Sequence, residues 1–227
     1  MGLNNKNTTK GICFTGIGYE DILLYMISIL KELGKKPLIT DFTQEHVFYS
    51  CIPHIDGIDP KKELLDIVNA YYAIADTKAA AQVMLLGKDN PSFKIALQDL
   101  NTIVPESEYI IIVSDEHRIH IEALEQSVEA LKGWKSCLII RNYTGVMKKR
   151  IERIASGISC ERLYVLPVSE KDYRNAVMAE YMGNCRFTHI SSDMQELLRE
   201  LILGIFDELA QKEYRQAYKR GSKGGKK

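Results

Sequence analysis

Short apolar runs alternate with amphipathic helical patterns along most of the chain, and this alternation restricts the possible folds more than any other feature. Six runs are predicted to be strands, at residues 11–15, 37–42, 93–100, 108–115, 135–143 and 162–169. Runs this apolar are typical of strands whose two faces are both buried, and helices between them indicate parallel pairing. We therefore expect an α/β fold with three layers, α/β/α, around a mostly parallel sheet of about six to eight strands.

The helical patterns complete this picture. Apolar residues recur at helical spacing from Ile22 to Leu33, and Gly34 is a typical helix end. We also expect helix over residues 60–87, in two pieces, because the composition there favours it. The last helix is predicted to begin with a capping-box pattern at Ser192 and to run to about residue 219.

Composition and charge exclude several classes of protein. No apolar run approaches the roughly 20 residues that span a bilayer, and the start of the chain has no secretion signal, so we expect a cytoplasmic protein. The net charge is zero, but residues 212–227 carry seven basic residues and one acidic one, which leaves about −6 on the remainder. A negative body argues against specific nucleic-acid binding. We predict a disordered tail at 1–9, one domain at 10–211 and a frayed basic tail at 212–227, which makes at most a weak contact with the inner membrane surface.

The first predicted strand ends in a glycine-containing loop that precedes a helix, where phosphates commonly bind. Gly16 and Gly18 fit a dinucleotide fingerprint, and Asp41 at the end of the second strand stands where a ribose ligand is found. The third glycine of that fingerprint is replaced by Asp21. An NAD(P)-dependent oxidoreductase, which would rest on Gly16, Gly18 and Asp41, is therefore one alternative.

The order of elements over residues 10–210 resembles the MinD/ParA group of P-loop ATPases. The segment GIGYED at 16–21 falls on the GVGKST part of that family's phosphate loop. The resemblance then assigns Asp41 to the position that orients the attacking water and Asp99 to a metal-associated position. It places Asn142 at the nucleotide base and aligns Pro167 with the proline after the family's sixth strand.

The loop departs from the family at the residues that hold phosphate. Tyr19 stands at the position of the phosphate-binding lysine, Glu20 at that of the magnesium-binding Ser/Thr, and Phe14 at that of the family's additional lysine. A carboxylate near 5 Å from a phosphate charge costs about 3 kcal/mol at an effective dielectric of about 20. Together with a lost charge-assisted hydrogen bond, this predicts ATP binding weakened by about a thousandfold. Glu20 and Asp21 instead fit internal anions at a helix N-terminus.

The chain keeps the family's order of strands and helices but has lost the phosphate-binding residues of the loop. In this combination it resembles the ATPase-like domain of the TadZ/CpaE pilus-assembly localisation proteins. This resemblance implies a non-catalytic pseudo-ATPase that acts through protein partners of an assembly apparatus, with a homodimer expected. Tyr19, Glu20 and Asp21 would then form a dimer or partner surface.

An alternative function is a nucleotide-binding switch that uses Asp41, Asp99 and Asn142 with unusual loop contacts. ATP and magnesium would then bind weakly. Our first expectation is that the chain has no cofactor and no catalytic residue.

One further polar cluster follows the fourth predicted strand. Asp115, His117 and His120 have a spacing at which a helix could hold a metal ion. Polar residues at that point more commonly cap the following helix, so we predict no metal site.

Overall fold

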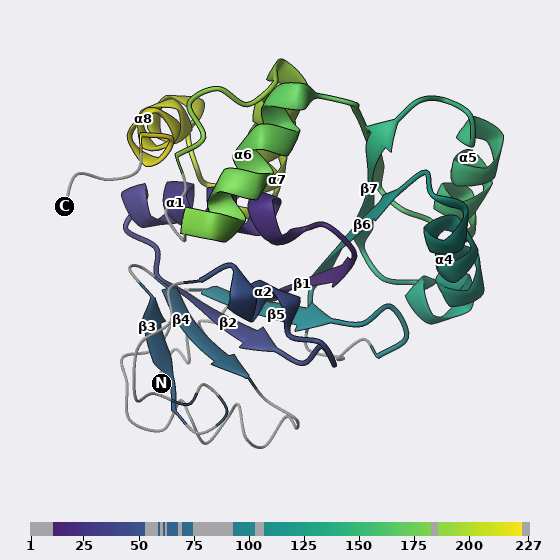
Figure 1. The fold of residues 1–227 in the computed structure, drawn as a ribbon, viewed down its shortest axis with the longest axis horizontal. Coiled ribbons are helices and arrows are strands. Elements are labelled where there is room, and N and C mark those ends of the chain that lie inside the picture. Colours follow the sequence, from purple (N-terminus) through teal and green to yellow (C-terminus); the bar gives the residue numbers. More distant parts are fainter. Residues whose placement is uncertain are drawn as a thin grey trace, which may run out of the picture.

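An eight-stranded sheet forms the middle layer of the protein in the computed structural model (Figure 1). The structure describes residues 11–52, 59, 61, 63–67, 70–74, 93–102, 107–182 and 186–223, and the predicted tail at 1–9 lies outside these ranges. The strands are β1 (Gly11–Gly16), β2 (Pro37–Asp41), β3 (Leu65–Ile67), β4 (Ala70–Ile74), β5 (Phe93–Gln98), β6 (Tyr109–Asp115), β7 (Ser136–Tyr143) and β8 (Arg162–Pro167). Their order is β3-β4-β2-β5-β1-β6-β7-β8, and all of these pairs are parallel except β3 with β4.

Helices cover both faces of this sheet. They are α1 (Glu20–Glu32), α2 (Val47–Ser50), α4 (Arg118–Leu131), α5 (Lys148–Gly157), α6 (Glu170–Met182), α7 (Ser192–Ile205) and α8 (Gln211–Gly221). The alternation along β1 shows how the layers divide: Ile12 and Phe14 belong to the core under α1 and α7, whereas Cys13 belongs to the core under α4 and α5 (Figure 1). The predicted three-layer α/β/α fold is confirmed.

The prediction of helix over residues 60–87 is wrong for its described middle part. Residues 65–67 and 70–74 form β3 and β4, and β4 pairs with β2 in parallel register. Tyr71 and Tyr72 favour a strand, and Leu65 and Ile67 are buried on either side of the exposed Asp66. Pairing with β2 therefore overrides the local helical propensity. Most of the remaining residues of 60–87 lie outside the described ranges.

The end of the chain differs from the prediction in two ways. One long helix was expected, but α7 ends at Ile205 and α8 begins at Gln211, with Ser191 as the N-cap of α7 in place of the predicted Ser192. The basic segment is not frayed over residues 211–221, because Tyr214 and Ala217 of α8 are buried in the core beside α1. None of the helices that the structure describes combines the length and apolar character required to cross a bilayer.

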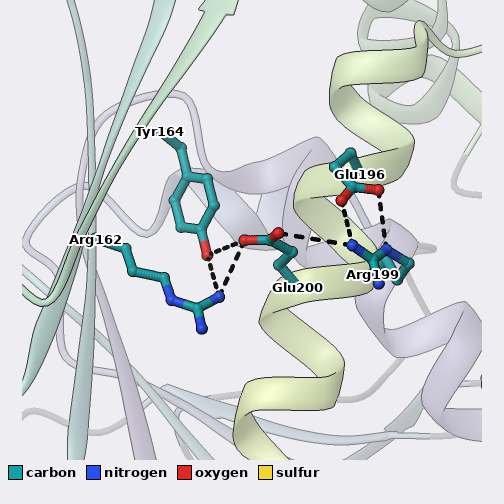
Figure 2. A network of polar contacts seen from close by, with 5 residues as sticks. All are labelled: Arg162, Tyr164, Glu196, Arg199 and Glu200. Carbon is teal, nitrogen blue, oxygen red and sulfur yellow. Dashed lines mark hydrogen bonds and ion pairs between the residues drawn. The ribbon is translucent and has the colours of Figure 1, made fainter. Parts of the chain in front are cut away.

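A polar network ties the edge strand β8 to α7 (Figure 2). Glu200 Oε2 accepts hydrogen bonds from Arg162 Nη1 and from Tyr164 Oη, each at 3.0 Å. Arg199 on the same helix donates to Glu196 and lies 3.6 Å from Glu200 Oε1. Burial raises the pKa of Tyr164 to about 12, so its hydroxyl remains a hydrogen-bond donor at neutral pH. The network fixes the position of the last strand against the helical layer.

Candidate functional site

The carboxyl ends of the parallel strands lie along one edge of the sheet, which is where ligands bind in open α/β folds. The loop at 16–21 follows β1 at this edge, Asp41 is the last residue of β2, and Asp99 directly follows β5. Since β2, β5 and β1 are neighbours, these three groups lie together. Asn142 near the end of β7 and Pro167 at the end of β8 lie two and three strands away from β1.

Two glycines shape the first loop. Gly16 has φ of 99°, and a Cβ added to it would lie 1.9 Å from the carbonyl oxygen of Val113 on β6. The next residue, Ile17, donates its N–H to that same oxygen at 3.0 Å. Gly18 has φ of 66°, in the left-handed region that glycine adopts readily. The loop is therefore held close to β6 in a conformation that requires glycine at position 16 and favours it at position 18.

Tyr19 is buried, with 3% of its surface exposed, and its ring lies 5.8 Å from that of Phe14. Burial raises the pKa of its hydroxyl, and the nearby carboxylates of Glu20, Asp41 and Asp99 raise it further. The position that carries a lysine in the resembled loop thus carries a neutral phenol within the core.

Asp21 forms a two-bond ion pair with Arg141. Arg141 Nη1 donates to Asp21 Oδ1 at 2.7 Å and Nη2 donates to Oδ2 at 2.9 Å, and the guanidinium also donates to the carbonyl of Gly18. Asp21 Oδ1 in addition accepts the N–H of Ile22 at 2.8 Å, at the start of α1. Burial raises the pKa of Asp21, and the charge and hydrogen bonds of Arg141 oppose that rise. The pair ties the phosphate-loop region to the end of β7.

Arg141 was not among the predicted site residues, although the sequence contains a signal for it. An arginine at the end of the apolar run of β7 needs an anionic partner when it is buried. Alternation along the strand places Arg141 on the same face as Ile139, which belongs to the core under α1. The neighbouring Asn142, which the resemblance had assigned to a nucleotide base, has φ of 51° and is exposed.

Asp41 is fully buried and its carboxylate is occupied by hydrogen bonds from its own chain. Oδ1 accepts from the N–H and hydroxyl of Thr43 at 2.9 and 2.6 Å, and Oδ2 accepts from the hydroxyl of Tyr72 at 2.7 Å. Burial raises the pKa of Tyr72, and the charge of Asp41 adds to the effect. Asp99 is half-buried and its Oδ2 accepts the N–H of Gln44 at 3.2 Å.

Fewer side chains of the loop are exposed than the predicted interaction surface requires. Asp21, like Tyr19, is only 3% exposed, so neither side chain is available to a partner in this structure, whereas Glu20 is half-buried. The expectation that the side chains of Tyr19 and Asp21 form part of a partner surface does not hold here. Their burial has a clear cause, since the ring packs in the core and the carboxylate pairs with Arg141.

Exposed apolar side chains occur in several segments that follow the strands at this edge. Eight large apolar residues are exposed in the part of the chain that the structure describes, and five of them lie one to six residues after the end of β2, β6, β7 or β8. We call these five the carboxyl-edge rim: Val47, Ile119, Val146, Val168 and Tyr173. Exposed apolar side chains at an edge where ligands bind are candidates for contact with a partner.

The cluster after β6 stabilises the start of α4. Asp115 Oδ1 accepts the N–H of His117 at 2.8 Å and lies 2.7 Å from His120 Nδ1. Within the described ranges, no group of three or more His, Cys, Asp or Glu side chains is placed to hold a metal ion.

Solved structures with the same fold come from the MinD/ParA group of P-loop ATPases. MinD from the MinC:MinD cell division complex of Aquifex aeolicus superposes with a TM-score of 0.57 at 16% identity, over 86% of this chain and 96% of that one. A putative plasmid partition protein of Borrelia burgdorferi bound to AMPPNP gives 0.56 at 13% identity, over 88% and 99%. An McdA variant of Cyanothece in complex with ATP gives 0.52 at 11%, over 90% and 99%.

These similarities establish a MinD/ParA-like P-loop fold across most of the chain. No protein-family profile matches the sequence, and no curated protein sequence matches it either. At such low identities the comparison shows the fold alone. The function must be inferred from the side chains at the carboxyl edge.

Proposed function

We propose that this protein is a non-catalytic member of the MinD/ParA-like fold, a scaffold or localisation protein that acts through protein–protein contacts. The observation that carries the proposal is the buried two-bond pair of Asp21 and Arg141 at the phosphate loop. The resemblance to TadZ/CpaE proteins makes a pilus or secretion apparatus the assembly that we expect it to serve. A homodimer or a complex with a component of that apparatus is the expected state.

The side chains of the loop do not fit a magnesium-bound nucleoside triphosphate. Tyr19 supplies no positive charge, Glu20 adds a negative one, and the charge of Arg141 is already compensated by Asp21. The N–H of Ile17 and that of Ile22 are bonded within the protein, to Val113 and to Asp21. A phosphate group would have to break these bonds while facing the carboxylate of Glu20, and two such charges at a distance of about 5 Å repel by about 3 kcal/mol at an effective dielectric of about 20.

The other family-matching residues also give little support to nucleotide chemistry. Asp41, the water-orienting position in the resembled family, is fully buried and accepts three hydrogen bonds from the protein itself. The same burial argues against a ribose contact, and hence against the NAD(P)-dependent alternative. The nucleotide-switch alternative retains Asn142, which is exposed at the correct edge.

The carboxyl-edge rim supports contact with another protein at this edge. Its five apolar side chains lie on the four segments that follow β2, β6, β7 and β8, at the same edge of the sheet as the loop after β1. Burying such side chains against a partner stabilises a complex by about 25 cal/mol for each Å² removed from water. MinD in the similar structure was solved with its protein partner MinC, so this fold has a precedent for protein recognition.

Nucleotide binding is tested by titrating the purified protein with fluorescent ATP and ADP, with and without magnesium. We expect no saturable binding up to about 1 mM, which corresponds to about −4 kcal/mol of binding free energy. NAD in place of ATP is a parallel titration for the dinucleotide alternative. Micromolar, magnesium-dependent binding of ATP would contradict the proposal.

Self-association at the rim is tested by sedimentation velocity. If the partner surface is used for a homodimer, the double variant Val146→Asp/Val168→Asp should sediment as a monomer at concentrations where the wild type dimerises. Leu163→Asp, which introduces an aspartate at an exposed apolar residue on β8 outside the rim, should leave the dimer intact. A dimer that is unchanged in the double variant would exclude the rim as the dimer interface.

A further inference from the structure

A basic groove lies along α6, separate from the carboxyl-edge rim described above. It has a volume of about 1030 Å³ and runs between one face of α6 and the segment 186–190. The charged and apolar side chains that matter for its chemistry are Lys171, Arg174, Met178, Arg186 and His189. The groove is therefore built from one face of α6 and from residues 186–190, which lie between α6 and α7 in the sequence.

The helical wall presents one continuous stripe. Residues 171, 174, 175 and 178 follow the spacing i, i+3, i+4 and i+7, which places them on one face of a helix. Lys171 and Arg174 lie toward the start of this stripe, and Met178, which is 48% exposed, lies at its other end. A peptide lying along the groove would meet positive charge first and an adaptable apolar side chain next.

Among the residues that the structure describes, no carboxylate pairs with the positive charges in the groove. Within the described part of the chain, Lys171, Arg174 and Arg186 are exposed and form no ion pair, whereas Arg150 and Arg162 elsewhere on the surface are paired with glutamates. Glu170 is the acidic residue among the described side chains that line the groove. Uncompensated cations in a concave surface focus a positive potential there.

The second wall is held firmly against the helices. Phe187 is fully buried, with its ring 4.8 Å from that of Tyr25 on α1 and 5.6 Å from that of Tyr218 on α8. Ser191 at the end of the segment donates its N–H and its hydroxyl to the carboxylate of Asp172 on α6, at 2.7 and 2.5 Å. The second wall is thus tied to α6 and packed against α1 and α8, so a ligand would find the groove largely formed.

We propose that this groove binds an acidic peptide segment of a protein partner, one that also carries an apolar side chain for Met178. Arg174 and Arg186 offer the planar donor geometry that pairs with carboxylates. The concave form and the exposed methionine suit a peptide better than a nucleic acid backbone. Long polyanions would also meet the acidic remainder of the chain, which carries about −6 outside residues 212–227.

The test is a selection from an unbiased library of random twelve-residue peptides displayed on phage, with the full-length protein as the target. The selected peptides are synthesised with a fluorophore and titrated by fluorescence anisotropy. We expect enrichment of Asp and Glu in the selected pool, with binding weakened by about tenfold or more in Lys171→Glu/Arg174→Glu, as expected for lost charge-assisted contacts. Arg186→Glu tests the opposite wall independently.

Two controls separate this groove from other surfaces. Lys149→Glu makes the same charge change as Arg186→Glu at an exposed residue of α5 and should leave binding unaltered, and so should the rim variant Val146→Asp/Val168→Asp. Circular dichroism establishes that each variant folds. A pool without acidic enrichment, or acidic peptides that bind the double variant as tightly as the wild type, would overturn the proposal.

Vesicles with phosphatidylserine and a short DNA duplex serve as competing probes. The proposal would also be overturned if the selected pool contained no acidic peptide while vesicles or DNA bound the wild type and not Lys171→Glu/Arg174→Glu. That result would identify a different polyanion as the ligand of the groove. Because the rim variant and the nucleotide titration leave the groove untouched, failure of this inference is distinguishable from failure of the proposed function.

Discussion

Removing the guanidinium of Arg141 is the perturbation that most directly tests whether its ion pair with Asp21 stabilises the loop after β1. Arg141→Met keeps the aliphatic length of the side chain but leaves the carboxylate of Asp21 buried without its cation. Asp21 is 3% exposed and the Arg141 side chain 17% exposed, so water cannot readily replace the lost partner. Breaking a buried pair in this way costs about 3–5 kcal/mol.

Urea denaturation measures this cost, followed by circular dichroism and by the fluorescence of Trp134, the single tryptophan. With a denaturant slope of about 2 kcal/mol/M, a loss of about 4 kcal/mol lowers the midpoint by about 2 M. The matched control is Arg153→Met, because Arg153 pairs with Glu125 at 2.9 Å but its side chain is 74% exposed. That variant should lose less than about 1 kcal/mol.

The double variant Asp21→Asn/Arg141→Met completes a thermodynamic cycle. If the two residues act as a pair, removing both charges should recover much of the loss, with a coupling free energy of about 2 kcal/mol or more. Equal midpoint shifts for Arg141→Met and Arg153→Met, or strict additivity in the cycle, would refute the argument that the loop is closed by a buried ion pair.

Three further predictions concern the same fold. Hydrogen bonding from Arg150 lowers the pKa of Glu125 to about 2, so its stabilisation is present above the ordinary value of 4.5 and is lost as the pH falls toward about 2. Glu125→Gln should therefore remove about 1 kcal/mol at neutral pH and flatten the acid decline of the urea midpoint, whereas an unchanged decline would contradict the assignment. Gly16→Ala should cost about 3 kcal/mol or more in urea denaturation, because its Cβ would overlap a backbone oxygen of β6, and a neutral effect would show that the loop rearranges freely. Tyr72→Phe should cost about 1–3 kcal/mol by leaving Asp41 short of a buried hydrogen bond, and a loss near zero would mean that the other bonds of Asp41 suffice.

Much of the fold could be predicted because strands that are buried on both faces of the sheet are recognisable in the sequence as short apolar runs. The runs that became β1, β2, β5, β6, β7 and β8 are apolar enough to be recognised individually, and helices α1 and α4 have regular apolar spacing. The strand ends were therefore predicted to within two residues, and with them the edge that gathers Asp41, Asp99 and the first loop. The exception is the segment at 65–74, whose helical propensity gave way to pairing with β2.

The chemistry of the loop, in contrast, depends on a contact between residues that are 120 positions apart. The sequence by itself determined that Tyr19 and Glu20 replace the phosphate-binding residues of the resembled family, and that Asp21 is an anion at a helix start. Only the tertiary structure decided that Arg141 neutralises this anion and that Tyr19 is buried in the core. The physical reason is that alternation within a strand determines on which face of the sheet a side chain lies. Strand order and crossovers, which depend on contacts between distant parts of the chain, determine which residues pack against that face.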